Sequence, residues 1–171
     1  MCARYALFGP FSPGNLVPGF VEHVVNPLAG FAQYNIAPSQ VNPVVVAGPG
    51  GPGLESMRWG LLPHWAKDPK IAYSTINARA ETLAEKPAFR DAWRRGQRCL
   101  VPVTGWYEWV DLGGKRKQPY FLRSSGEHNP MMFAGLWSRW TDAEGKQVAT
   151  YTVVTTEAMG EVRRVHDRQP Q

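Results

Sequence analysis

The residue after the initiator methionine is a cysteine, one of only two in the chain. Removal of Met1 would leave Cys2 with a free α-amine and a β-thiol on neighbouring atoms. An α-amine has a pKa of about 7.7–8.0 and a thiol has one of about 8.5, so both are partly in the nucleophilic form near neutral pH. Cys2 is therefore a candidate nucleophile, and an ordinary cysteine near the N-terminus is the alternative.

Glu108 is a candidate general acid because aromatic residues flank it in the sequence. The stretch WYEW at 106–109 is predicted to be a strand, and strand alternation places Glu108 on the face of Trp106, opposite Tyr107 and Trp109. Removal from water in an aromatic setting would raise the carboxyl pKa and make the group usable near pH 7. A solvent-facing glutamate on a half-buried strand is the alternative interpretation.

His166 is a candidate proton carrier near the other end of the chain and the most natural one among the four histidines. It opens the tripeptide HDR at 166–168, in which Asp167 and Arg168 could form a surface ion pair. A lone histidine is more often structural, so both interpretations of His166 stay open at this point.

Asn77, Arg79 and Trp65 could bind a polar ligand. Asn77 and Arg79 are two residues apart and point the same way in an extended segment, and an amide beside a guanidinium suits a substrate that carries a phosphate. Trp65 ends the polar segment PHW, where it either packs inward or stacks on a flat ligand such as a base. For the Asn77–Arg79 pair, anchoring of a loop is the alternative.

Composition and charge describe one ordinary globular domain. The chain has 171 residues, of which 43% are hydrophobic and 12% aromatic, and this suits a single core and excludes disorder. Two cysteines cannot form a disulfide framework or a CxxC metal site, so we expect no metal. A net charge of +5 fits a polyanionic partner without requiring one. Without a signal peptide or a membrane-spanning segment in the sequence, we expect an intracellular protein.

Two segments rich in Pro and Gly, 10–20 and 47–53, are predicted to be surface loops. The segments at 41–47 and 54–60 flank the second loop, and the first of them is a β-branched run typical of a buried strand. Together they predict a hairpin.

The strongest helical pattern covers residues 80–95, where Pro87 suits a first helical position and Gly96 a C-terminal cap. We expect Pro87 to split this segment into a short turn and a helix. Beyond it, four segments rich in β-branched and aromatic residues alternate with polar turns, which indicates consecutive antiparallel strands. We therefore predict an α+β fold with a mostly antiparallel, curved, barrel-like sheet and a few flanking helices. The four segments are RCLVPVTGWYEWV (98–110), PYFLR (119–123), PMMFAGLWSRW (130–140) and QVATYTVVTT (147–156).

Seven short motifs occur in a fixed order from the first residues to the last. They are MCAR (1–4), YNIAPSQ (34–40), RWGLLPHW (58–65), INARAET (76–82), RCLVPVTGWYEW (98–109), KQPYF (117–121) and VHDRQP (165–170). In this order they resemble the SOS response-associated peptidase (SRAP) family of abasic-site-binding proteins.

The resemblance implies a SRAP-like fold in a single domain over 1–171 and covalent binding of abasic sites in single-stranded DNA in the DNA damage (SOS) response. In such proteins Met1 is lost, and Cys2 forms a Schiff base and then a thiazolidine with the aldehyde of the lesion. The peptidase activity is self-removal of residues before Cys2, and weak lyase activity is implied at the Schiff-base stage. Motif matching assigns catalysis to Cys2, Asn77, Glu108 and His166, phosphate contacts to Arg4, Arg79 and Arg168, and base contacts to Trp65 and Trp109.

We also expect no cofactor, a monomer without a membrane partner, and a cytoplasmic location, at the nucleoid if the source is a bacterium. The chain departs from the family pattern at two points. Ala3 stands where the family usually has Gly, directly beside the nucleophile. Family members also continue for several dozen residues beyond HDR-x-P, so we expect this chain to lack the family's C-terminal segment.

Three other interpretations stay open on the residues alone. An N-terminal-nucleophile hydrolase such as a glutamine amidotransferase also begins with Met-Cys, but no clear Asn-Gly pair is present to form its oxyanion hole. A non-covalent module for single-stranded nucleic acid would use Trp65, Trp109 and the arginines. An inactive fragment that ends at Gln171 is the third.

Overall fold

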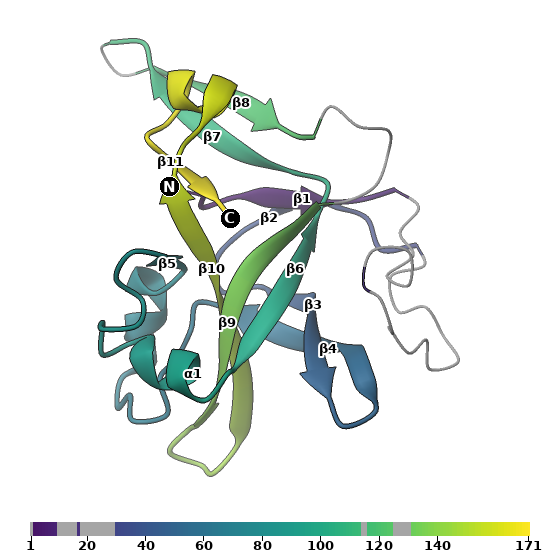
Figure 1. Cartoon of the computed structure of the whole chain (residues 1–171), viewed down its shortest axis with the longest axis vertical. Coiled ribbons are helices and arrows are strands. Elements are labelled where there is room, and N and C mark those ends of the chain that lie inside the picture. Colours follow the sequence, from purple (N-terminus) through teal and green to yellow (C-terminus); the bar gives the residue numbers. More distant parts are fainter. Residues whose placement is uncertain (1, 10–16, 18–29, 114–115, 125–130) are drawn as a thin grey trace.

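The computed structural model describes residues 2–9, 17, 30–113, 116–124 and 131–171, and it is mostly β-structure with few helices (Figure 1). Met1, most of the predicted loop at 10–20 and parts of two of the predicted turns lie outside the described residues. In chain order the elements are β1 (Tyr5–Leu7), β2 (Gln33–Ile36), β3 (Val41–Gly48), β4 (Gly51–Trp59), a 3-10 helix (Pro69–Ser74), β5 (Asn77–Arg79), α1 (Arg90–Arg94), β6 (Arg98–Val103), β7 (Gly105–Asp111), β8 (Lys117–Leu122), β9 (Met131–Thr141), β10 (Gln147–Glu157), a second 3-10 helix (Gly160–Arg164) and β11 (Arg168–Pro170).

Five strands close into a barrel in the order β10, β4, β3, β6, β9, because β9 also pairs with β10 (Figure 1). β3 and β4 form the predicted hairpin, in register as far as Gly48 opposite Gly51. The predicted loop at 47–53 is therefore reduced to a tight turn, since strand pairing continues through most of it. Fully buried residues from three different strands, Val44, Met57 and Val101, belong to the core inside.

The expectation of a mostly antiparallel sheet is only partly right. β10 runs parallel to β4, with Thr150 opposite Arg58, and it also runs parallel to β5. A closed ring with an odd number of strands cannot alternate in direction all the way round, so a five-stranded barrel must contain at least one parallel pair. The four other neighbouring pairs of the ring are antiparallel.

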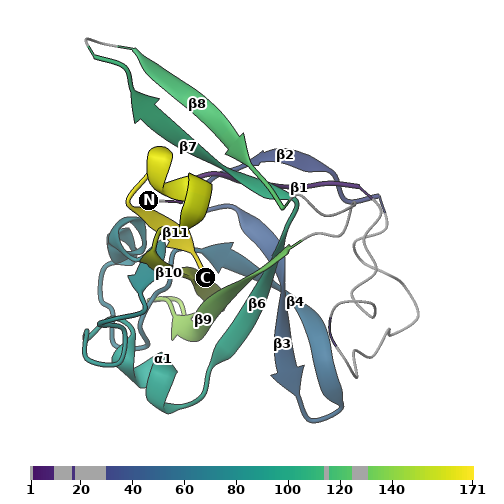
Figure 2. The same cartoon turned by 45° about the horizontal axis from the view of Figure 1, so that its top comes forward.

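The predicted strand at 98–110 is divided at Thr104 between two sheets. β6 stays in the barrel, whereas β7 joins a second sheet in the order β2, β1, β7, β8. Thr104 Oγ1 donates to the Phe8 carbonyl at 2.8 Å and accepts from the Phe8 N–H at 2.9 Å, which fixes this corner against the chain that leaves β1. Figure 2 shows the β7–β8 hairpin extending beyond the barrel.

The predicted division of residues 80–95 into a turn and a helix is present in the structure, but the helix begins later than Pro87 and is shorter than expected. Residues 80–89 form turns, and only α1 is a regular helix. Pro87 has no N–H to continue a helix begun earlier, and Lys86 O instead accepts from the N–H groups of Phe89 and Arg90 at 2.9 Å. Gly96 has a φ of 67° and takes the expected position after the last turn.

The core also fixes the segment that enters β5. Trp59 is fully buried and its indole Nε1 donates to the Ile76 carbonyl at 2.9 Å, one residue before β5 begins. The Trp59 ring lies edge-on against Tyr5 and stacks on Tyr151, and the two tyrosine hydroxyls share a hydrogen bond of 2.7 Å. The buried indole of Trp59 therefore holds β1, β5 and β10 together.

Candidate functional site

Cys2 and Asn77 meet where the first residues of the chain pass β5. Cys2 is 1% exposed and lies just before β1, which pairs with β2 and β7. Asn77 begins β5 opposite Val153 of β10, and its Nδ2 donates a hydrogen bond of 2.8 Å to the Cys2 carbonyl. Asn77 Oδ1 is buried, and none of the described residues donates to it. A polar acceptor therefore lies close to the candidate nucleophile.

Glu108 is buried in β7, the strand that pairs with β1. The burial pattern of β7 puts Glu108 and Trp106 on its buried face, as alternation requires. Burial raises the pKa of the Glu108 carboxyl, and the charge of His166 opposes part of this rise. Burial and, secondarily, the charge of Glu108 raise the pKa of the Cys2 thiol, so the sulfur keeps its proton at neutral pH.

β11 brings the C-terminal residues to the end of β10. The Arg168 backbone N–H donates to His166 Nδ1 at 2.9 Å, and Asp167 Oδ1 lies 2.8 Å from the same ring nitrogen. The Arg168 guanidinium donates to both carboxylate oxygens of Glu81 at 2.6 and 2.8 Å and to the Thr155 carbonyl at 2.7 Å. These contacts give the final residues a fixed place beside β5 and β10.

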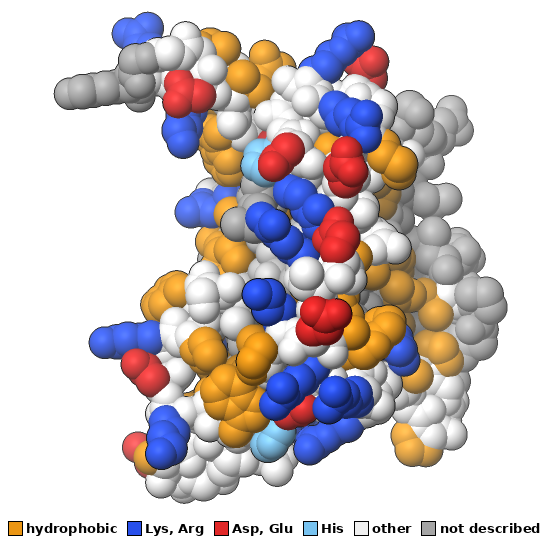
Figure 3. Space-filling view, turned by 60° about the vertical axis from the view of Figure 1, so that its left-hand side comes forward, with side chains coloured by type: hydrophobic (Ala, Val, Ile, Leu, Met, Phe, Trp, Pro, Cys, Tyr) orange, Lys and Arg blue, Asp and Glu red, His pale blue; other side chains and the backbone are white. Residues whose placement is uncertain are grey.

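A cavity of about 370 Å³ opens beside Asn77. Arg79 and Lys86 line it with positive charge, and Trp65 and Phe89 line it with aromatic surface. Trp65 is 45% exposed, so its ring can receive a flat group while an anion meets Arg79. On the side of the molecule that carries β5, Lys and Arg side chains gather with acidic side chains among them (Figure 3).

Two of the predicted binding residues have neighbours outside this cavity. Arg4 is half-buried, and its Nη1 donates to Asn35 Oδ1 of β2 at 3.0 Å. Trp109 is 39% exposed and lies beside Tyr107, with ring centroids 6.4 Å apart. Since alternate residues of a strand point to opposite faces, Trp109 and Glu108 face different sides of the second sheet.

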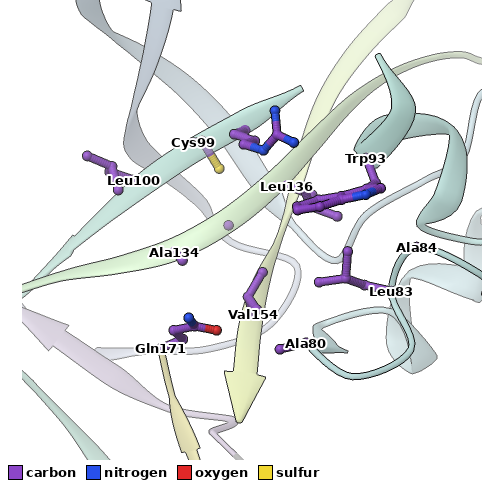
Figure 4. A pocket seen from close by; sticks show the side chains of 12 residues that line it. Ala80, Leu83, Ala84, Trp93, Cys99, Leu100, Ala134, Leu136, Val154 and Gln171 are labelled. Carbon is purple, nitrogen blue, oxygen red and sulfur yellow. The ribbon is translucent and has the colours of Figure 1, made fainter. Parts of the chain in front are cut away.

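A second cavity, of about 410 Å³, contains none of the predicted site residues (Figure 4). Trp93, Leu83, Leu136 and Val154 give it an apolar lining, and Cys99 borders it. Burial raises the pKa of the Cys99 thiol to about 12, as it also raises that of Cys2, and Cys99 differs from Cys2 in being internal, without an α-amine that could be freed beside its thiol. No sequence pattern pointed to this cavity, because its lining comes from turns and strands far apart in the chain.

Sequence reasoning missed two partners of the predicted arginines. Asn35 accepts from Arg4, and Glu81 holds Arg168. Both residues lie inside motifs quoted above. Their place in these motifs was the only feature of the sequence that could have indicated a role in the site. Within the described ranges, no group of three His, Cys, Asp or Glu residues could hold a metal ion, and no helix is long and apolar enough to cross a membrane.

Curated proteins with similar sequences are named for abasic sites. The abasic site processing protein YoqW of Bacillus subtilis (strain 168) is 38% identical over 171 residues, which cover 99% of this chain and 75% of that protein. The abasic site processing protein HMCES of Xenopus tropicalis is 32% identical over 137 residues, which cover 68% of this chain and 41% of that protein.

Solved structures share the fold. A protein from Bacteroides thetaiotaomicron superposes with a TM-score of 0.73 at 29% identity, over 81% of this chain and 61% of that chain. A phage-related protein from Bordetella bronchiseptica gives 0.69 at 28% identity, over 99% of this chain and 76% of that chain. The family model of the SOS response associated peptidases (SRAP) matches residues 1–171. From its first residue to its last, the chain belongs to the SOS response associated peptidase family.

Proposed function

We propose that this protein binds abasic sites in single-stranded DNA covalently through Cys2 and so shields the lesion in the DNA damage response. One observation carries the proposal: the Asn77 amide is hydrogen-bonded to the Cys2 carbonyl at 2.8 Å. The charge of the buried Glu108 carboxyl, which contributes to the raised pKa of the Cys2 thiol, supports it. The names of the relatives YoqW and HMCES, both abasic site processing proteins, support the same substrate.

The reaction begins once Met1 has been removed. The free Cys2 amine adds to the C1′ aldehyde of the opened abasic sugar, and loss of one water gives a Schiff base. The Cys2 sulfur then bonds to the imine carbon while the thiol proton passes to the nitrogen, which closes a thiazolidine. Because both nucleophiles belong to one residue, the second bond needs no further diffusional encounter.

Glu108 and His166 are the groups that move protons before ring closure. An abasic sugar is mostly a closed hemiacetal, and opening it requires a proton at the ring oxygen and loss of the hydroxyl proton. A buried carboxyl with a raised pKa keeps a proton to give at higher pH than an exposed one. Asn77 Oδ1, an acceptor without a donor among the described residues, is placed to receive a bond from the amine or from a sugar hydroxyl.

The DNA strand is proposed to run past the cavity beside Asn77. Arg79 is exposed at its rim for a phosphate oxygen, and Trp65 offers a ring for a neighbouring base. Arg4, Arg168 and Trp109 complete the proposed binding set. Such stacking needs unpaired bases, which favours a single strand over a duplex.

Two weaker activities belong to the same proposal. Self-removal of residues before Cys2 is the peptidase activity, and β-elimination from the Schiff base is a slow lyase side reaction with which ring closure competes. We further propose that the protein acts as a monomer in the cytoplasm, at the nucleoid if its source is a bacterium.

The test is intact-mass spectrometry of the protein before and after incubation with a single-stranded oligonucleotide that carries one abasic site. We expect loss of Met1 and an adduct equal to the sum of the two masses less one water, stable to heating. Cys2→Ala and Cys2→Ser should form no such adduct, whereas the matched control Cys99→Ser should form it at the normal rate.

Three results would count against the proposal. A heat-stable adduct in both Cys2 variants would assign the bond to another residue. Salt-sensitive binding of undamaged strands with no adduct would indicate a non-covalent module. Ammonia release from glutamine would indicate an amidotransferase.

A further inference from the structure

Glu81 joins two of the chain segments that carry proposed catalytic residues, those of Asn77 and His166. It lies two residues after β5, and its carboxylate receives two hydrogen bonds, of 2.6 and 2.8 Å, from the guanidinium of Arg168. The Thr155 carbonyl accepts from Arg168 Nη2 at 2.7 Å and from the Ala80 N–H at 2.9 Å. The end of β5 and the start of β11 are therefore fastened to the same point of β10.

The guanidinium of Arg168 has few donors left for any other partner. Glu81 takes one hydrogen of Nη1 and one of Nη2, and Thr155 takes the second hydrogen of Nη2. Of the five N–H groups of an arginine, this leaves Nε, which is buried with no acceptor among the described residues, and one hydrogen on Nη1. The Arg168 side chain is only 12% exposed. Its contacts hold β11 against β5 and β10, in addition to any contact that it makes with a phosphate.

Arg168 also contacts His166 through its backbone N–H. The Arg168 N–H donates to His166 Nδ1, and this requires a lone pair on Nδ1 and puts the proton of a neutral ring on Nε2. Asp167 Oδ1, 2.8 Å from the same nitrogen, favours the opposite arrangement, with a hydrogen on Nδ1. The two bonds cannot be made at once, so the position of the Arg168 backbone decides between them.

We infer that Glu81 is a positioning residue: by clamping Arg168 it keeps the first N–H of β11 against His166 and holds the imidazole in its Nε2–H form. Among the described residues, the charged groups that interact with this ring or lie beside it include Asp167 on its own segment, Arg168 on β11 and Glu108 on β7. Without the hydrogen bonds between Glu81 and Arg168, β11 can move, and His166 Nδ1 then donates to Asp167 instead of accepting from the Arg168 N–H. The consequence for crosslinking rests on the proposed function, whereas the consequence for the ring does not.

The first test is independent of DNA. Two-bond ¹H–¹⁵N correlation spectra distinguish the two neutral forms of a histidine ring. In the unchanged protein we expect His166 to be in the Nε2–H form. In Glu81→Gln, whose side chain keeps one acceptor but no charge, the equilibrium should shift toward the Nδ1–H form. The shift should be larger in Glu81→Ala. An unchanged His166 spectrum in both folded variants would overturn the inference.

The second test measures crosslinking at saturating abasic DNA together with the affinity for an undamaged strand. Proton transfer by a placed side chain contributes about 10²–10⁴-fold to a rate, so partial misplacement should slow Glu81→Gln by about tenfold. Affinity for the undamaged strand should stay the same or rise, since a negative charge is removed. The matched control is Glu55→Gln, which removes another exposed carboxylate bonded twice to an arginine, Arg139.

The outcomes of the second test separate the two proposals. An equal fall in rate and affinity, or an equal fall in the control, would assign Glu81 a general structural or electrostatic role and overturn the inference. If the unchanged protein forms no crosslink, the proposed function fails, and the His166 spectra still decide the role of Glu81.

Discussion

Replacing Asn77 with alanine should weaken both the fold and the proposed reaction, because one amide serves both. The Nδ2 bond of 2.8 Å to the Cys2 carbonyl connects β5 with the start of the chain. Loss of the donor leaves a carbonyl acceptor next to a fully buried side chain, which costs about 1–3 kcal/mol. For a chain of this size each kcal/mol lowers Tm by about 2–4 °C. We therefore expect Asn77→Ala to melt about 2–12 °C lower.

The rate of crosslinking should fall by a comparable free energy. If the bond holds Cys2 in place during attack, a loss of about 1–3 kcal/mol slows the reaction about 5- to 150-fold, since about 1.4 kcal/mol corresponds to a factor of ten. Asn77→Asp should be slower still, because it keeps the shape of the side chain but sets a second acceptor against the Cys2 carbonyl.

The assay is a single-turnover crosslinking time course with protein in excess over an abasic oligonucleotide, run below the melting temperature of each variant. Binding of an oligonucleotide that carries a reduced abasic sugar, which has no aldehyde, reports non-covalent affinity and should change little. Gln147→Ala, which removes an exposed amide at the far end of β10, is the control. A normal crosslinking rate in Asn77→Ala despite a lowered Tm would refute the reasoning and leave Asn77 a purely structural role.

Three further predictions concern the elements around the site. Because burial raises the pKa of Glu108 above its value of 4.5 in the unfolded chain, the stability of the unchanged protein should fall as pH rises from that value through the folded pKa. Glu108→Gln should remove this dependence, so its stability relative to the unchanged protein should rise with pH by up to about 1.4 kcal/mol per pH unit. Urea unfolding of both proteins between about pH 4 and 8 measures this. Parallel plots of unfolding free energy against pH would contradict the prediction. Trp59→Phe leaves the Ile76 carbonyl without its indole donor and should cost about 1–3 kcal/mol in thermal unfolding and slow crosslinking as well, whereas a slowed reaction at unchanged Tm would not fit. Gly135→Ala would place a Cβ 2.7 Å from Cys99 Sγ and should cost about 1–3 kcal/mol in thermal unfolding, more than Cys99→Ala does.

Much of the fold was predictable because strand patterns are local. The hairpin of β3 and β4 and the strands β8, β9 and β10 were predicted from segments, most of them rich in β-branched and aromatic residues, that lie between turn signals. The helix expected from Pro87 was predicted too long, since an apolar residue at helical spacing also suits a turn, such as the one that buries Phe89. The break at Thr104 gave no signal, because apolar residues continue on both sides of it.

For the candidate site, the sequence could supply a set of residues and not their arrangement. The spacing within each motif supplied a nucleophile, an acid and a paired amide and guanidinium, and alternation placed Glu108 on the buried face of β7. Glu81 stood inside a quoted motif, but nothing in the sequence joined it to Arg168, which is 87 residues away.

By itself the sequence determined the family, through ordered motifs, and the chemistry that each side chain can offer, because both depend only on residue identity and local order. The tertiary structure alone decided that the barrel has five strands and therefore a parallel pair, and that Cys2, Asn77 and Glu108 come together from three different strands or their ends. It also decided that the Arg168 guanidinium is held by Glu81 and that the Arg168 backbone N–H donates to His166 Nδ1. Ring closure and contacts between distant segments depend on how the whole chain packs, and no local periodicity carries that information.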